Sequence, residues 1–259
     1  MDLVNDAIKA TVNTGEYNDF VSILNAIRYH SHSLDSSSLE NQLLDLWAIF
    51  ETVLDISNQH TTDRIQQICM FLVPILKRNY IYSLLKQFAD DIKNYNEEMY
   101  NFIIGDAITE QAIIQRIGEF SLLPENEERR KAALEKCDDF PLLKERLSYY
   151  SAALKTPAEV HSFVEKHADR VKWQIMRIYR NRNLIIHNGR SMPYLSLLIE
   201  NLHSYVDDFL AYTIHTLAQK KSIETMCQEL FVKECKWNAS LPRQKKENTR
   251  EDVEYILSA

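Results

Sequence analysis

Apolar residues recur at intervals of three and four along most of this chain, which is the spacing of amphipathic helices. The 259 residues include only 4 glycines and 6 prolines. So few helix breakers favour long helices with short polar turns over a many-stranded sheet with glycine-rich turns. We therefore expect an all-α fold. The expected helices cover approximately residues 3–12, 17–30, 38–56, 63–74, 79–95, 102–120, 124–137, 141–154, 157–188 and 194–221.

Polar segments suggest where this helical chain divides. A serine-rich stretch at Ser31–Ser38 resembles a linker, and Ser37 and Glu40 form a capping box for the helix that follows. Pro74 is expected to kink or end its helix, and Gly105 to interrupt another. We predict an N-terminal helical extension at 1–37, a helical domain at 38–221 and a peripheral segment at 222–259, with one or two helical turns near its start.

The clearest start signal belongs to the longest helix. Thr156 stands at the N-cap, Pro157 at the first helical position and Glu159 two residues later. The apolar pattern then continues without a breaker to Asn188 and Gly189. This helix is expected to span about 30 residues, and to form an αα-hairpin with the helix that follows Pro193.

Charge is concentrated on this long helix. The whole chain carries a net charge of −7, which argues against a general polyanion binder. The segment 170–190 carries +6 and no acid, which leaves −13 for the rest. One basic band on an acidic protein indicates a local phosphate site, although a solvated helix face gives the same pattern. Its basic residues are Arg170, Lys172, Arg177, Arg180, Arg182 and Arg190.

Cysteine spacing and the amino-terminal sequence bear on location. Four scattered cysteines with no C-x-x-C pair suggest reduced thiols, not a disulfide or zinc site. The first six residues lack the basic and apolar regions of a signal peptide, and no apolar run approaches the roughly 20 residues of a membrane span. We expect a cytoplasmic protein that does not associate with membranes.

Arg182 interrupts the apolar face of the long helix. The stripe that it continues is formed by Val160, Val164, Val171, Ile175 and Ile178. Burying an unpaired guanidinium costs several kcal/mol. Arg182 must therefore meet a carboxylate, an interface or a ligand phosphate, and Glu51 beside the stripe of an earlier helix is a candidate carboxylate.

His187 provides a second candidate group. It lies one turn after Asn183 and on the same side as Arg180, so Asn183 can fix the imidazole tautomer. Arg182 points about 140° away in a continuous helix. Three arrangements would bring Arg182 and His187 together: an unwound helix end, a curled arginine side chain, or a pair drawn from two chains of a dimer.

The region from about Ser38 to Lys221 resembles a HEPN domain, and specifically the ApeA-like branch of prokaryotic HEPN proteins. The resemblance rests on Leu39-Glu40-Asn41-Gln42-Leu43, Leu46-Trp47, Phe50-Glu51, Arg180-Asn181-Arg182-Asn183 and His187-Asn188-Gly189. It implies an antiparallel helical bundle and a metal-independent endoribonuclease that works as a homodimer with a composite site. Arg182 and His187 are then the catalytic pair and Asn183 supports them. Arg180 satisfies the looser Arg-x6-His spacing and could replace or assist Arg182.

The residue types suit this chemistry. RNA carries its own nucleophile, and an imidazole can take the 2′-OH proton or protonate the leaving 5′-oxygen. Arginine holds the phosphate and balances the charge that develops on it. We expect Arg177, Arg180, Arg190 and Glu51 to bind RNA or support the site. We expect no cofactor and no metal, since His30 and His32 face apart on a helix.

Three functions remain open from the sequence. The first is a ribonuclease effector in phage defence or stress, of the toxin type, which by family analogy needs a partner, sensor domain or trigger to restrain it. The second is a non-catalytic HEPN module that binds RNA, a nucleotide or a protein. The third is a structural helical adaptor with Arg182 in a salt bridge. The sequence contains no Gly-rich phosphate loop, G-x-S-x-G elbow or H-E-x-x-H motif.

Overall fold

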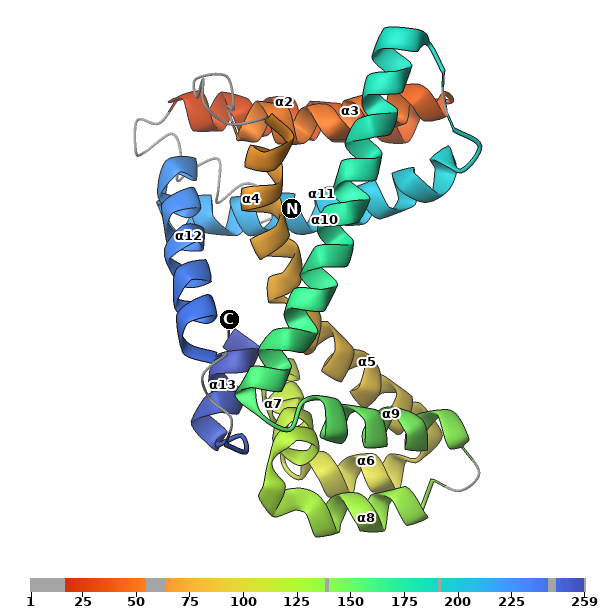
Figure 1. Ribbon diagram of the computed structural model, residues 1–259, viewed down its shortest axis with the longest axis vertical. Helices are drawn as coiled ribbons and strands as arrows, with labels where there is room; N and C mark the ends of the chain where they lie inside the picture. Colours follow the sequence, from red (N-terminus) through yellow and green to blue (C-terminus); the bar gives the residue numbers. More distant parts are fainter. Residues whose placement is uncertain (1–16, 55–63, 138–139, 191, 242–245, 259) are drawn as a thin grey trace. The chain divides into compact units, whose positions relative to one another are not determined.

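The computed structural model of the protein describes residues 17–54, 64–137, 140–190, 192–241 and 246–258 (Figure 1). Within these ranges the only regular elements are helices, which confirms the all-α class. The predicted helix at 3–12 lies outside them. The helices are α2 (Tyr17–Asp35), α3 (Leu39–Val53), α4 (Arg64–Arg78), α5 (Tyr80–Tyr95), α6 (Glu97–Ile104), α7 (Glu110–Leu122), the 3₁₀ turn η2 (Pro124–Asn126), α8 (Glu127–Glu135), α9 (Pro141–Ala153), α10 (Pro157–Asn188), α11 (Leu195–Ala218), α12 (Ile223–Ser240) and α13 (Arg250–Ser258).

Contacts divide the chain into two compact units. Unit 1 is Met1–Leu76 with Ala168–Val232, and unit 2 is Lys77–His167 with Lys233–Ala259. The division falls inside α4, α10 and α12, so each of these helices contributes residues to both units. It differs from the predicted boundaries after residues 37 and 221, because periodicity identifies the apolar face of a helix but not the helix against which that face packs.

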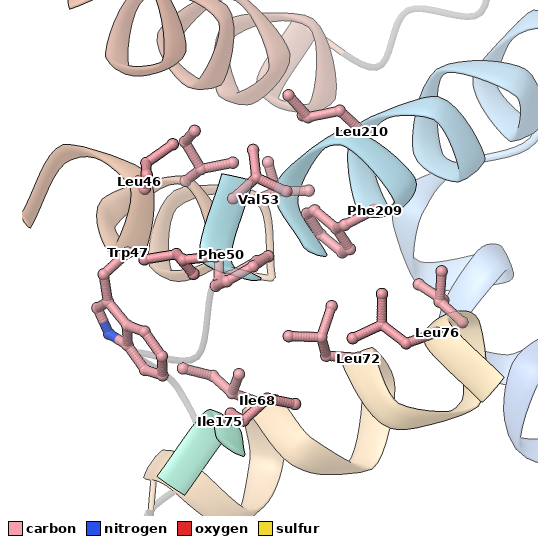
Figure 2. Packing of buried hydrophobic residues seen from close by; sticks show 14 of the residues in the cluster. Leu46, Trp47, Phe50, Val53, Ile68, Leu72, Leu76, Ile175, Phe209 and Leu210 are labelled. Carbon is pink, nitrogen blue, oxygen red and sulfur yellow. The ribbon is translucent and has the colours of Figure 1, made fainter. Parts of the chain in front are cut away.

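The core of unit 1 packs against one face of the part of α10 that belongs to this unit. α2 packs along α3, and α3 packs against α11. In the core, the Phe50 ring meets those of Trp47 and Phe209 edge to face, with centroids 5.8 and 5.3 Å apart (Figure 2). Ile175 and Ile178 of α10 are buried in the same cluster. Each fully buried side chain of this size contributes roughly 1.5–3 kcal/mol, so the apolar face of α10 is firmly fixed.

Only the last three residues of the serine-rich stretch, 36–38, connect two helices. α2 continues into the stretch as far as Asp35, and the Ser33 hydroxyl donates to the carbonyl of His30 (2.7 Å), which satisfies a polar side chain within a helix. The N-cap of α3 is Ser38, whose oxygen accepts from the backbone N–H of Asn41 at 3.3 Å. The predicted cap at Ser37 was therefore wrong by one residue, as neighbouring serines offer the same capping group.

Helices α4 and α5 contain a long apolar stretch. Of the two effects expected of Pro74, a kink or a helix end, the end is wrong, because α4 continues to Arg78. The stretch Arg64–Tyr95 has the length and composition that crossing a membrane requires. Its apolar side chains also have partners within the protein, because Leu72 is buried in unit 1 and Phe88 in unit 2. Burial within the two cores is therefore sufficient to explain this composition.

The carboxyl-terminal residues are not peripheral, which corrects the prediction for 222–259. α12 extends to Ser240 and α13 follows it. Trp237 and Val253 are buried in the core of unit 2. The side chain of Asn248 is also buried and donates to the carbonyl of Leu154 at 2.7 Å. The polar residues around 243–248 concealed this arrangement, because only a few apolar positions in α13 reach the core.

The long helix α10 begins and ends as predicted. The backbone N–H of Glu159 donates to the Thr156 hydroxyl (3.2 Å), and the N–H of Thr156 donates to the Glu159 carboxylate (3.0 Å). The helix ends at Asn188, and Gly189 takes a positive φ of 58°, which glycine adopts without strain. All basic residues of the band except Arg190 therefore lie on α10.

Candidate functional site

The Ala168–Asn188 stretch of α10, in unit 1, has two unlike faces. One carries Val171, Ile175 and Ile178 into the core, and Arg182 continues the same stripe. The other face is exposed and includes Arg180 and His187. The two faces place the two candidate arginines, only two residues apart, in different surroundings.

Arg182 is held by groups of the protein. Its side chain is 22 % exposed, and its Nη2 lies 3.4 Å from Oε2 of Glu51 on α3. Its Nη1 donates to the side-chain oxygen of Asn183 at 3.1 Å. Glu51 also accepts from the indole N–H of Trp47 (3.0 Å) and lies 3.5 Å from Nε of Arg64. The carboxylate considered in the sequence analysis is therefore the partner of Arg182, and this pairing satisfies the partly buried guanidinium.

The continuity of α10 removes one way of joining Arg182 to His187. The helix is regular through both residues and ends only at Asn188, so it is not unwound between them. Five residues of α-helix separate the two side chains by about 140° around the axis. Arg182 instead reaches its sequence neighbour Asn183. Asn183, which lies between the two faces, thus connects Arg182 to the surface that carries His187.

Arg180, Asn183 and His187 lie along one side of α10, at i, i+3 and i+7. All three line a single open pocket of about 640 Å³, with Asn188 at its end. Arg180 and His187 are exposed, and neither side chain forms a hydrogen bond or ion pair with any residue that the structure describes. A guanidinium and an imidazole that have no partner in the described part of the chain are therefore available to a ligand in the same pocket.

The remaining lining of the pocket combines apolar side chains with a second arginine. Arg177 lies with its guanidinium carbon 5.3 Å from the ring centroid of Tyr194 and donates to the Gln174 side chain at 3.4 Å. These contacts hold its charge beside the pocket. The described residues that line the pocket include no acid. The apolar lining residues are Ile65, Trp173, Met176, Tyr179 and Leu184.

Sequence reasoning missed Trp173 and Met176. Both are exposed, and Trp173 is 69 % exposed, more than any other tryptophan of the chain. They precede Arg180 by seven and four residues, so they fall on the same side of the helix. Large apolar residues on the polar face were the available signal, since such residues mark binding surfaces when they cluster.

The other predicted residues divide between the pocket and its surroundings. Arg190 is exposed beyond the helix end, and its backbone N–H donates to the carbonyl of Leu184 at 3.5 Å. Its side chain is not part of the pocket lining. Glu51 supports Arg182 from α3. Among the described residues, no three histidine, cysteine or acidic side chains are grouped as metal ligands.

Comparisons with protein-family models, curated proteins and solved structures found no match to this chain.

Proposed function

We propose that this protein is a metal-independent endoribonuclease with its active centre on the exposed side of α10. The single observation that carries the proposal is that Arg180, Asn183 and His187 share one pocket, on the basic segment of an otherwise acidic protein. The resemblance of the same segment to HEPN ribonucleases supports it. The proposal includes a HEPN-type bundle.

Arg180 takes the place of the principal arginine in this proposal. It is exposed and unpaired within the described structure, so a phosphate can displace water from its guanidinium without breaking a protein contact. Arg182 is already bonded to Glu51 and Asn183. We therefore assign Arg182 as a positioning residue, which holds Asn183 beside the imidazole, rather than as the group that grips the phosphate.

The cleavage step uses groups that the substrate and the pocket supply. The 2′-oxygen of the ribose attacks the neighbouring phosphorus and loses its proton, while the bond from phosphorus to the 5′-oxygen breaks and that oxygen gains a proton. The products are a 2′,3′-cyclic phosphate and a 5′-hydroxyl. The His187 imidazole serves one of the two proton transfers. Arg180 balances the charge that grows on the non-bridging oxygens.

The biological setting follows from the resemblance. The active form is a homodimer in which two such pockets form a composite site and a second imidazole serves the other proton transfer. The protein is a cytoplasmic effector of the anti-phage or toxin type, and a regulatory partner or sensor restrains it. Like the cleavage itself, these statements are parts of the proposal.

A non-catalytic binding module is the second candidate. The observation that favours it is the large apolar share of the pocket, which includes Trp173 and Met176 and which phosphate chemistry does not need. Such a surface suits binding as well as cleavage. The two candidates differ in whether RNA strands are broken and whether His187 is needed to break them.

The test incubates the purified protein with end-labelled RNA in EDTA and analyses the products. We expect fragments with 2′,3′-cyclic phosphate ends, and no cut where the nucleotide before the scissile phosphate is 2′-deoxy, because the nucleophile is then missing. His187→Ala should lower the cleavage rate by about 10²–10⁴-fold. His215→Ala on α11, another exposed helical histidine, is the matched control and should cleave normally. Cleavage at a 2′-deoxy position, or full activity of His187→Ala, would contradict the proposal.

A further inference from the structure

The apolar half of the pocket on α10 has no task in phosphodiester cleavage. Trp173 is 69 % exposed, whereas Trp47 and Trp237 are 1 % and 7 % exposed. Met176, also exposed, lies beside it on the lining. Keeping an indole in water forgoes the 150–250 Å² of burial that an aromatic ring normally provides. A ligand with a flat apolar surface would recover that burial.

Spacing along the helix relates this surface to the proposed reaction centre. Trp173 precedes Arg180 by seven residues, which is two turns of helix or about 10.5 Å, and within 20° of the same direction. His187 continues the series by another two turns. The stacking surface and the phosphate-binding guanidinium are therefore separated by a distance comparable with the size of a nucleotide.

The chemistry of the lining indicates what kind of ligand fits. Arg177 and Arg180 supply positive charge, and the lining residues identified here include no acid to oppose it. Asn183 and Asn188 supply amides that can pair with the polar edge of a base. An aromatic face, cations and amides together suit a nucleotide, whose base is flat and whose phosphate is anionic.

We propose that this apolar half of the pocket binds the base of an unpaired nucleotide, which stacks on Trp173 while a neighbouring phosphate lies at Arg180. The inference rests on the proposed function and specifies its substrate as single-stranded RNA. A duplex keeps its bases stacked on one another and paired, so it offers no base to Trp173. Trp173 is thus a specificity-determining residue, and it takes no part in the proton transfers.

The test measures binding of a labelled 2′-O-methyl oligonucleotide, which lacks the nucleophile and is not cut, by fluorescence anisotropy at one fixed salt concentration. Trp173→Ala should weaken single-strand binding by about 10-fold or more, because stacking on an aromatic side chain is lost. Trp173→Phe should stay within about 3-fold of the wild type, since a smaller ring still stacks. Phe231→Ala, which removes another exposed aromatic of unit 1, is the matched control and should bind normally.

Tryptophan emission gives a second readout, because Trp173 is the one exposed tryptophan of the three. Single-stranded oligonucleotide should quench the emission, and the duplex of the same sequence at the same concentration should not. Equal binding of duplex, or unchanged binding by Trp173→Ala, would overturn the inference. Emission that does not change with RNA but does change with protein concentration would also overturn the inference, because a second copy then covers the indole.

The outcomes also separate this inference from the cleavage proposal. If RNA is cut and Trp173→Ala binds and cuts like the wild type, the base-binding inference fails and the ribonuclease stands. If single strands bind through Trp173 and unmodified RNA is never cut, the ribonuclease fails. The base-binding pocket is then supported as the site of an RNA-binding module.

Discussion

Two stretches of α10 use their charges in opposite ways. In unit 2, Pro157–His167 presents Glu165, which accepts from Lys77 Nζ at 2.7 Å and from the Trp237 indole N–H at 3.1 Å. Lys77 is only 6 % exposed. In unit 1, Ala168–Asn188 presents cations to solvent, and several of them have no partner among the described residues.

The difference indicates what each group of charges is for. A buried ammonium such as Lys77 is tolerated only because Glu165 and Glu234 compensate it, so its contacts serve stability. Arg180 is exposed and its side chain has no partner among the described residues, so it can bind a ligand without breaking a contact of the fold. Arg182 lies in the basic segment, but its bond to Glu51 makes it a cation that serves stability, like Lys77.

The largest stability effect should come from breaking the paired cluster of unit 2. Lys77→Ala leaves two carboxylates without their cation, and since both are partly exposed we expect a loss of about 2–3 kcal/mol in the free energy of unfolding. Lys86→Ala is the matched control, because Lys86 pairs with Glu110 on an exposed surface. Its loss should lower the free energy of unfolding clearly less than Lys77→Ala does, because solvent screens an exposed pair. If urea unfolding shows equal losses of stability for Lys77→Ala and Lys86→Ala, the proposed difference between buried paired cations and exposed cations is contradicted.

A smaller effect on stability is expected from His203 of unit 1, and it should depend on pH. Burial and the nearby His30 lower the pKa of His203 on α11, and Asp207 partly opposes this shift. The unfolded state therefore binds a proton more readily, so the stability that this group contributes is present above pH 6.5 and is lost as the pH falls through the lowered pKa. His203→Gln should flatten this part of the pH dependence of unfolding, measured by thermal melts.

His215→Gln, which makes the same substitution at an exposed histidine of α11, is measured beside His203→Gln as the control. His203→Gln should also leave RNA cleavage unchanged at pH 7, since its side chain is not part of the pocket lining. If His203→Gln loses stability as steeply as the wild type when the pH falls below 6.5, the lowered pKa of this group does not contribute to the stability of the fold.

Much of α10 was predictable because its signals are local. The reciprocal bonds of Thr156 and Glu159 and the positive φ of Gly189 depend on a few adjacent residues. The need of Arg182 for a partner followed from its place in the apolar stripe, and Glu51 meets it. Such features require no knowledge of the rest of the fold.

Features that depend on distant contacts were not predictable. Trp237 belongs to the core of unit 2, although its segment reads as polar. The helical pattern places Trp173 on the polar face of α10, but its exposure depends on whether another helix packs against that face. The choice between Arg180 and Arg182 likewise required the contacts of both guanidinium groups.

The most direct measurement compares Arg180→Ala with Arg182→Ala for RNA cleavage and for the free energy of unfolding, on the same preparations. Arg180→Ala should lower cleavage by about 10²-fold, as removal of one charge-stabilising donor does, and change stability by less than about 0.5 kcal/mol. Arg182→Ala should lower stability by about 1–2 kcal/mol, because Glu51 loses a partner, and reduce cleavage less while it stays folded. Loss of cleavage in Arg182→Ala at full stability, with Arg180→Ala as active as the wild type, would contradict the assignment of the exposed side of α10 as the active centre.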